Sequence, residues 1–172
     1  MKKILFGLSL VMIMVSGCKQ AKNENNDAVI CKENRETPDF SKGVMDEKIL
    51  WYLGRLGDVQ VSPDGQTLLY AVTYYDYRAN KGNTELYTMP TAGGDSKRIT
   101  VSEENEMQPI WRPDGKKIAY LRANEKGMQI WEADPDGSNP KAISNVEGDI
   151  NGFGYSPDMK HICYFQNVRY KC

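Results

Sequence analysis

The chain has 172 residues, of which 40% are hydrophobic and 26% are charged, a composition that is ordinary for a globular protein. Its formal net charge of −1 creates no overall field that would attract nucleic acid, so a nucleic-acid partner is not expected. The 15 glycines, 8 prolines and 10 tyrosines favour an all-β fold, because turn formers and aromatic residues are typical of short strands joined by tight turns.

Residues 1–17 have the pattern of a lipoprotein signal peptide. Lys2 and Lys3 precede an apolar run from Ile4 to Val15, which is too short to form a permanent transmembrane helix. The residues Val15-Ser16-Gly17-Cys18 resemble a bacterial lipobox, in which small residues permit cleavage and the cysteine carries the lipid. We therefore expect an exported chain that is lipidated at Cys18 and anchored to a membrane in the periplasm or at the cell surface. An ordinary signal peptide with a chance cysteine is the alternative.

Two short regions precede the strands. Residues 18–44 are rich in Asn, Lys, Glu and Asp, and they are predicted to form a disordered tether because they have too little apolar surface to offset the entropy of ordering. Residues 45–57 are predicted to form a helix and a linker, with Asp46 as the helix cap and Gly54 ending the helix. Three apolar side chains fall on one face of this helix: Ile49, Leu50 and Leu53.

A tight turn occurs three times in the rest of the chain. Its copies are Pro63-Asp64-Gly65, Pro113-Asp114-Gly115 and Pro157-Asp158. Proline presets the backbone for a turn, aspartate accepts hydrogen bonds from the nearby backbone, and glycine adopts the positive φ that follows. A tyrosine follows each proline by seven residues. The recurrence of the aspartates at one turn position indicates a structural role rather than metal binding.

The spacing of these landmarks indicates a β-propeller. Pro113 and Pro157 are 44 residues apart, as are Tyr87 and Trp131, while Pro63 precedes Pro113 by 50 residues. A period near 44 with four strands per unit is typical of propeller blades. We therefore predict an all-β, partial β-propeller of about two and a half four-stranded antiparallel blades, at about 58–101, 107–145 and 150–172. Two and a half blades are too few to close a propeller ring. We therefore expect the chain to be a fragment of a longer gene product; closure of the ring by other chains is the less favoured alternative.

The first unit carries six residues more than the period requires, before Tyr87. This insertion contains four residues that suit a contact surface: Tyr74, Tyr75, Tyr77 and Arg78. An extended hairpin whose tyrosines cover the edge of the blade explains the insertion equally well.

The entry into the first blade resembles a known family. The helix and linker, followed by Val59-Gln60-Val61-Ser62-Pro63-Asp64-Gly65, are similar to the N-terminus of secreted prolyl oligopeptidase-family serine peptidases, in the dipeptidyl-peptidase and acylaminoacyl-peptidase branches. The blade motif is also shared with TolB-like propellers. The peptidase resemblance implies a propeller that restricts access to an α/β-hydrolase domain with a Ser-Asp-His triad.

Catalytic residues are not assigned in this chain. It has no G-x-S-x-G nucleophile motif, and its single histidine, His161, has no identified serine and carboxylate partners. The remaining cysteines, Cys31, Cys163 and Cys172, match no metal-site spacing, so neither metal nor cofactor is expected. A Cys163–Cys172 disulfide is less favoured than unpaired thiols.

The function expected from the resemblance is that of a non-catalytic propeller segment of an exported, lipid-anchored serine peptidase. The segment would control the access of peptides to a hydrolase domain that this chain lacks. The alternative is a TolB-like propeller lipoprotein that binds other proteins of the cell envelope. The expected partners are a membrane, through the lipid, and either a peptide substrate and hydrolase domain or envelope proteins.

Overall fold

The computed structural model describes residues 29–32 and 35–168. The predicted signal peptide, Cys18 and Cys172 therefore lie outside the described residues. The described part contains the helix α1, Glu47–Tyr52, and ten strands. The strands are β1 Arg55–Val61, β2 Thr67–Asp76, β3 Lys81–Pro90, β4 Lys97–Arg98, β5 Met107–Trp111, β6 Ile118–Asn124, β7 Gly127–Ala133, β8 Lys141–Ala142, β9 Ile150–Tyr155 and β10 Ile162–Gln166.

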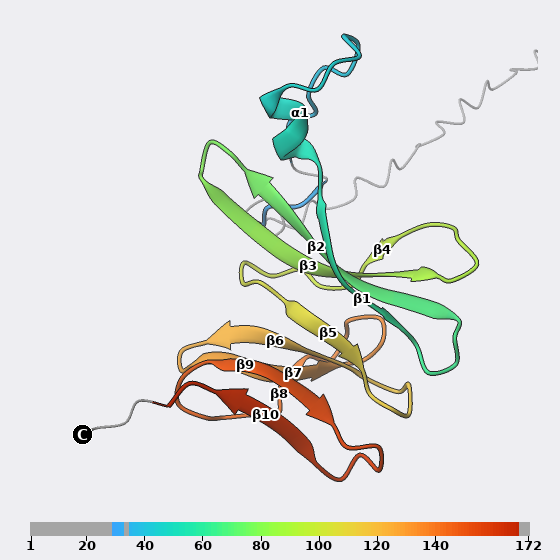
Figure 1. Ribbon diagram of the computed structural model, residues 1–172, viewed down its shortest axis with the longest axis vertical. Helices are drawn as coiled ribbons and strands as arrows, with labels where there is room; N and C mark the ends of the chain where they lie inside the picture. The colour runs from blue at the N-terminus through green and yellow to red at the C-terminus, as the bar shows by residue number, and fades with distance from the viewer. Residues whose placement is uncertain (1–28, 33–34, 169–172) are drawn as a thin grey trace, which may run out of the picture.

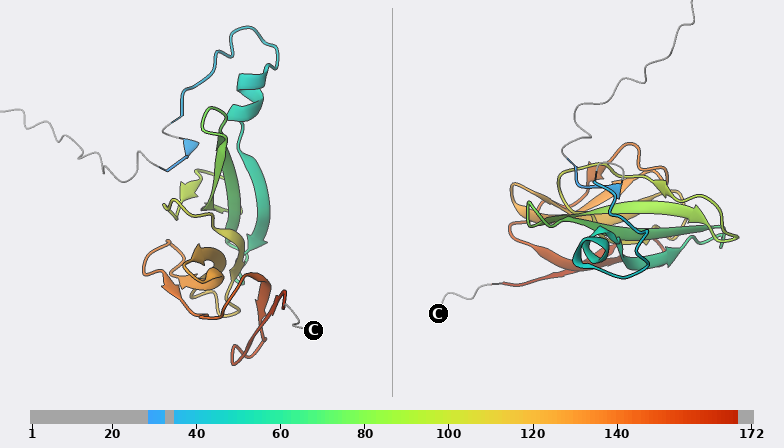
Figure 2. Two further views of the ribbon diagram at one scale, coloured as in Figure 1. Left: turned by 90° about the vertical axis from the view of Figure 1, so that its left-hand side faces the viewer. Right: turned by 90° about the horizontal axis from the view of Figure 1, so that it is seen from above.

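These strands form three antiparallel sheets, which confirms the predicted all-β partial propeller with one short helix. Blade 1 is a sheet in the order β1-β2-β3-β4, blade 2 has the order β5-β6-β7-β8, and blade 3 consists of β9 and β10. Figure 1 shows the three sheets stacked from blade 1 at the top to blade 3 at the bottom, without closing into a ring. The view from above in Figure 2 shows the sheets lying over one another.

The repeated turn has the same hydrogen bonds in each blade. In blade 1, Ser62 N donates to Thr67 O at 2.8 Å, and Asp64 Oδ1 accepts from Gln66 N at 3.0 Å. The Oδ1 atoms of Asp114 and Asp158 accept equivalent bonds from the backbone N–H two residues later. The aspartates thus hold the turns closed, by the usual Asx-turn geometry.

The three turns differ at the position after the aspartate. Gly65 and Gly115 have φ angles of 74° and 69°, while Met159, at the same place in blade 3, has a φ of 57°. Glycine reaches this left-handed region at no steric cost, whereas a residue with a Cβ is strained there.

The core lies between the blades. Leu69, Ala71 and Leu86 of blade 1 pack against Ile118 and Tyr120 of blade 2, and all five are buried. Fully burying an aliphatic side chain contributes roughly 1.5–3 kcal/mol, so this junction is a main source of stability. A second cluster on the other face of blade 2 packs against blade 3; its buried members are Ala119, Leu121, Ile130 and Ile150.

The strand register confirms that the two complete blades are copies of one unit. Tyr70 pairs with Tyr87 across β2 and β3, and Tyr120 pairs with Trp131 across β6 and β7. The middle strands of the two complete blades are therefore paired in the same register, and residues at equivalent positions can be compared directly.

One difference between the two blades is electrostatic. Glu85 and Glu106, 1% and 0% exposed, lie at the junction of blades 1 and 2, near Arg98 and Arg122. The residues 44 positions later, Gln129 and Ile150, are buried but uncharged. Burial raises the pKa of Glu85 to about 7 and also raises the pKa of Glu106, because a carboxylate loses hydration there.

The N-terminal region differs from its prediction in three respects. Residues 29–32 and 35–44, which were predicted to be disordered, include the buried Val29 and Cys31 and a hydrogen-bonded arginine, Arg35. The predicted linker after Gly54 is already strand, since β1 begins at Arg55. Only Ile49 of the predicted apolar helix face is buried, whereas Leu50 and Leu53 are 45% and 41% exposed.

Candidate functional site

The hairpin that joins β2 and β3 extends beyond the end of the repeat. The two strands stay in register as far as the pair Asp76 and Lys81. The Oδ1 atom of Asp76 accepts from the N–H groups of Arg78 and Ala79 at 2.8 and 3.0 Å, and so closes the turn. The six additional residues of the first unit therefore lengthen a β-hairpin, and they project toward α1 (Figure 1).

Arg35 connects this hairpin to the helix. Its guanidinium group donates to Tyr52 O at 2.6 Å, to Trp51 O at 3.2 Å and to Tyr75 O at 3.3 Å. The same group lies 4.6 Å from the ring centroids of both Tyr52 and Tyr74. A planar guanidinium suits this place because its donors satisfy the last carbonyls of the helix while its faces contact the rings.

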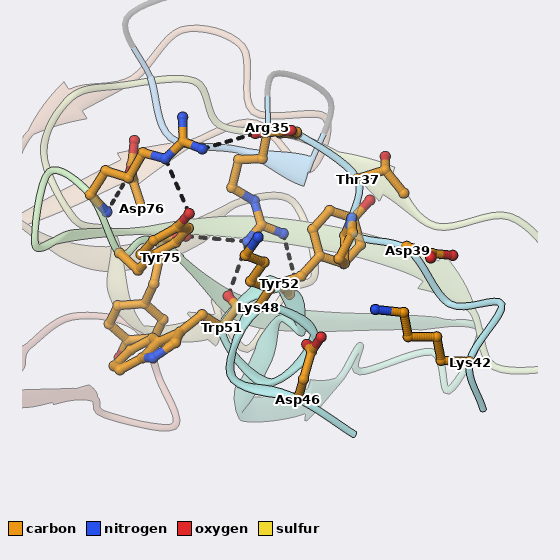
Figure 3. A pocket seen from close by; sticks show the side chains of 14 residues that line it. Arg35, Thr37, Asp39, Lys42, Asp46, Lys48, Trp51, Tyr52, Tyr75 and Asp76 are labelled. Atoms are coloured by element: carbon orange, nitrogen blue, oxygen red, sulfur yellow. Dashed lines mark hydrogen bonds and ion pairs between the residues drawn. The ribbon is translucent and has the colours of Figure 1, made fainter. Parts of the chain in front are cut away.

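A hollow of about 550 Å³ lies between these elements (Figure 3). Its aromatic wall includes Trp51 and Tyr75, whose rings are 5.5 Å apart and meet edge to face. The other residues that line it are Arg35, Glu36, Thr37, Pro38, Asp39, Lys42, Asp46, Lys48, Tyr52, Asp76, Tyr77 and Arg78. This volume lies within the range of small-molecule and peptide sites.

The charges around the hollow are mixed. Arg78 lies 3.3 Å from Glu36 across its rim, and both side chains are largely exposed. Arg78 also donates from Nε to the hydroxyl of Tyr77 at 3.1 Å. Asp46 is engaged as the helix cap, since its Oδ1 accepts from Ile49 N at 2.8 Å. The site therefore combines aromatic surfaces with charged side chains of both signs.

The structure brings together three of the four residues that the sequence suggested as a contact loop. Tyr75, Tyr77 and Arg78 line the hollow, whereas the ring of Tyr74 is stacked on Arg35. Sequence reasoning missed Arg35 and Trp51. Arg35 stands in a polar stretch that shows no periodicity, and its partners in the helix and the hairpin are 16 to 40 residues away in the chain.

A second hollow, of about 590 Å³, lies between blades 2 and 3 and includes Arg112, Glu132, Tyr155 and His161. The hydroxyl of Tyr155 donates to Glu132, and this bond together with burial raises the pKa of the tyrosine. The backbone N–H and carbonyl of His161 both bond to Ser156 and close the third turn. The Tyr155–Glu132 bond therefore links blade 3 to blade 2, while the bonds of His161 stabilise the turn within blade 3.

Two features are absent from the described part of the chain. Within 29–32 and 35–168, no group of three or more His, Cys, Asp or Glu residues is placed to hold a metal ion. In the same residues, no helix has the length and apolar character needed to cross a membrane.

No family model matches the chain. Two curated relatives are dipeptidyl-peptidase 5 from Porphyromonas gingivalis, 39% identical over 118 residues, and dipeptidyl-peptidase 5 from Porphyromonas endodontalis, 31% identical over 126 residues. These matches cover 69% and 73% of this chain but only 17% and 18% of the relatives. The chain thus spans less than a fifth of the length of these two relatives.

Solved structures of peptidases resemble this chain as well. An acylaminoacyl peptidase from Pyrococcus horikoshii superimposes with a TM-score of 0.57 and 27% identity, over 69% of this chain and 18% of the peptidase. The β-propeller domain of the trilobed protease from Pyrococcus furiosus gives a TM-score of 0.51 with 28% identity, over 64% of this chain and 34% of that domain. The chain is related to the propeller of prolyl oligopeptidase-family peptidases. This relationship confirms the resemblance found in the sequence.

TolB propellers also share the fold of this chain. TolB from Acinetobacter baumannii superimposes with a TM-score of 0.54 and 24% identity, over 64% of this chain and 26% of TolB. At this identity the likeness shows the fold alone.

Proposed function

We propose that the chain is the non-catalytic N-terminal propeller segment of an exported, lipid-anchored serine peptidase of the prolyl oligopeptidase family. The observation that carries this proposal is the 39% identity over 118 residues with a dipeptidyl-peptidase 5. Identity at this level goes beyond the 24% shared with a TolB protein, which reflects the fold. Catalysis is assigned to an α/β-hydrolase domain that is separate from residues 1–172.

The role of the propeller segment in this proposal is to control which peptides reach the hydrolase domain. The hollow beside the β2–β3 hairpin supports a direct contact with peptide. Its rings, including Trp51 and Tyr75, can bind an apolar side chain, and its charges, including Lys48 and Arg78, can bind polar groups of an extended backbone. Aromatic and arginine side chains are enriched at such contacts.

Anchoring by a lipid on Cys18 is the second part of the proposal, and it rests on the lipobox-like residues 15–18. Growth of cells with an alkyne-bearing fatty acid is expected to label the chain, and Cys18→Ala is expected to abolish the label. Labelling that persists in Cys18→Ala contradicts this assignment.

The decisive experiment for the function is to sequence the genomic DNA downstream of the Cys172 codon. A reading frame that continues through further blades into a G-x-S-x-G motif supports the peptidase assignment. Further blades followed by a stop codon overturn it and support the alternative, a TolB-like propeller lipoprotein that binds proteins in the cell envelope. The isolated chain is expected to show no turnover of dipeptidyl substrates under either assignment, since no triad is assigned in it.

A further inference from the structure

The acidic side chains that line the hollow beside the β2–β3 hairpin are already engaged within the chain. Glu36 lies 3.3 Å from Arg78, and Asp39 Oδ1 accepts from the backbone N–H two residues later at 2.9 Å. The other two, Asp46 and Asp76, accept from backbone N–H groups, as the helix cap and in the hairpin turn. Each carboxylate around the hollow is therefore stabilised by a donor of the chain itself.

Two basic side chains of the hollow are not engaged in this way. Lys42 and Lys48 are exposed, and neither has a hydrogen-bond or ion-pair partner among residues 29–32 and 35–168. Figure 3 shows both among the side chains around the hollow. Arg35, in contrast, donates to three carbonyl groups, and Arg78 is paired with Glu36. The charges left for a ligand are therefore the positive charges of two lysines.

Lys48 and Trp51 place a positive charge beside an aromatic ring. They are three residues apart in α1, so they lie on the same side of the helix, with Cβ atoms about 5–6 Å apart. The Trp51 side chain is 41% exposed, and its ring meets that of Tyr75 edge to face. In an extended peptide, side chains two residues apart lie on the same side and are separated by roughly 6–7 Å. The spacing of Lys48 and Trp51 therefore matches two such side chains.

The aromatic wall of the hollow is held in place by one side chain. The guanidinium of Arg35 donates to the carbonyl oxygens of Trp51, Tyr52 and Tyr75, which all line the hollow. Their backbone is therefore fixed before a ligand arrives, and binding has little ordering entropy to overcome. Because the guanidinium is occupied by these contacts, discrimination by charge is left to the lysines.

We propose that the hollow selects acidic peptides, namely extended segments that carry an aspartate or glutamate two residues from an aromatic residue. The aromatic side chain packs against Trp51 and Tyr75, and the carboxylate is attracted by Lys48 and Lys42. A peptide with a lysine in place of the acidic residue is disfavoured, because the carboxylates of the hollow are already engaged. The inference rests on the proposed function, since it names the class of peptide that the propeller segment admits.

The test uses the full chain and three fluorescein-labelled peptides that differ only at the position two residues before a phenylalanine. This position holds glutamate, glutamine or lysine, and the C-termini are amidated to remove the terminal carboxylate. Since each exposed lysine–carboxylate contact contributes little, we expect fluorescence anisotropy to show about fivefold tighter binding of the glutamate peptide than of the glutamine peptide. The lysine peptide is expected to bind most weakly. Salt at roughly 0.5 M is expected to reduce the differences by screening.

A double variant tests the assignment of the two lysines. Lys42→Gln combined with Lys48→Gln is expected to bind the glutamate and glutamine peptides equally, with the affinity for the glutamine peptide unchanged. Lys141→Gln, which alters an exposed lysine on β8, is the matched control and is expected to keep the preference. Equal binding of the glutamate and glutamine peptides by the unaltered chain, or a preference that persists in the double variant, overturns the proposal.

Trp51→Ala distinguishes the selectivity from the peptide site itself, because it is expected to weaken binding of all three peptides by the same factor. If the unaltered chain binds the three peptides equally and Trp51→Ala weakens them all, the hollow binds peptide without selection by charge, and only the selectivity is overturned. If none of the three peptides binds, both the selectivity and the peptide site of the proposed function are overturned.

Discussion

Gly137 lies against the carbonyl oxygen of Ile99, and this contact joins the β7–β8 turn of blade 2 to the end of blade 1. The turn needs glycine for two reasons: its φ is 86°, and a Cβ would lie 1.7 Å from the oxygen. Gly93 has a similar φ of 90° in blade 1, but a Cβ placed on it would meet no atom within 4 Å. A comparison of the two glycines therefore distinguishes the cost of the positive φ, which both share, from the cost of the steric clash, which arises only at Gly137.

Gly137→Ala is therefore expected to lower the free energy of unfolding by more than about 2 kcal/mol, since the conformational penalty of roughly 1–2 kcal/mol is joined by a clash with backbone. Gly93→Ala, the matched control, is expected to lose only the conformational part, of roughly 1–2 kcal/mol. Urea denaturation followed by circular dichroism measures both. Equal losses in the two variants would show that the blade contact contributes nothing.

The blade 1–blade 2 junction is expected to weaken as the pH rises. Burial raises the pKa of Glu85 from 4.5 to about 7, and nearby Glu106 raises it further, while Arg98, with Nη1 3.2 Å away, opposes the shift without cancelling it. The folded chain then binds more protons than the unfolded chain between pH 4.5 and 7, so the free energy of unfolding falls through this window. The loss is of order 3 kcal/mol.

Glu85→Gln copies Gln129, the residue at the same position in blade 2, and is expected to flatten this pH dependence. Glu106 keeps part of the slope, because burial also raises its pKa. Urea denaturation at pH 5 and pH 8 measures the effect, with the exposed Glu125→Gln as the control. A slope in Glu85→Gln as steep as in the control would show that Glu85 is ionised throughout.

Met159→Gly is expected to stabilise the chain. Met159 has a φ of 57° where the other two turns have glycine, and its side chain is 44% exposed, so little packing is lost. The substitution relieves roughly 1–2 kcal/mol of backbone strain. Glycine also makes the unfolded chain more flexible, which costs roughly 0.5–1 kcal/mol. The free energy of unfolding is therefore expected to rise by about 0.5 kcal/mol. A rise in thermal midpoint for Met159→Gly, with a fall for Gly65→Ala, is the expected pair of results. A fall for Met159→Gly would mean that its side chain packs usefully.

The hollow beside the β2–β3 hairpin is expected to bind peptide if the proposed function holds. Trp51→Ala removes one aromatic wall and is expected to weaken binding of a fluorescein-labelled peptide containing one phenylalanine, by roughly 1 kcal/mol or more. Fluorescence anisotropy measures the affinity. Tyr164→Ala, which removes an exposed ring from blade 3, is the control and should leave the affinity unchanged. If both variants bind the peptide with equal affinity, the hollow is not the peptide-binding site.

The repeat and the fold class were accessible from the sequence because they depend on local chemistry. The Pro-Asp-Gly turns close through bonds between residues at most five apart, and Asp46 caps its helix three residues away. Such interactions recur wherever the same residues recur, so a period of 44 residues predicted blades. The six extra residues before Tyr87 were likewise predictable, because the first unit is longer than the regular spacing of 44 residues between equivalent positions.

Only the tertiary structure showed the contacts of the N-terminal residues and the hollow beside the β2–β3 hairpin. Arg35 reaches Tyr75 across 40 residues, and Val29 and Cys31 are buried although the sequence around them is polar. A polar sequence predicts disorder when its own apolar surface is too small, but an existing sheet can supply the surface that the segment lacks. The same reason explains Glu85, since the pKa of a carboxyl group depends on the blade that packs over it.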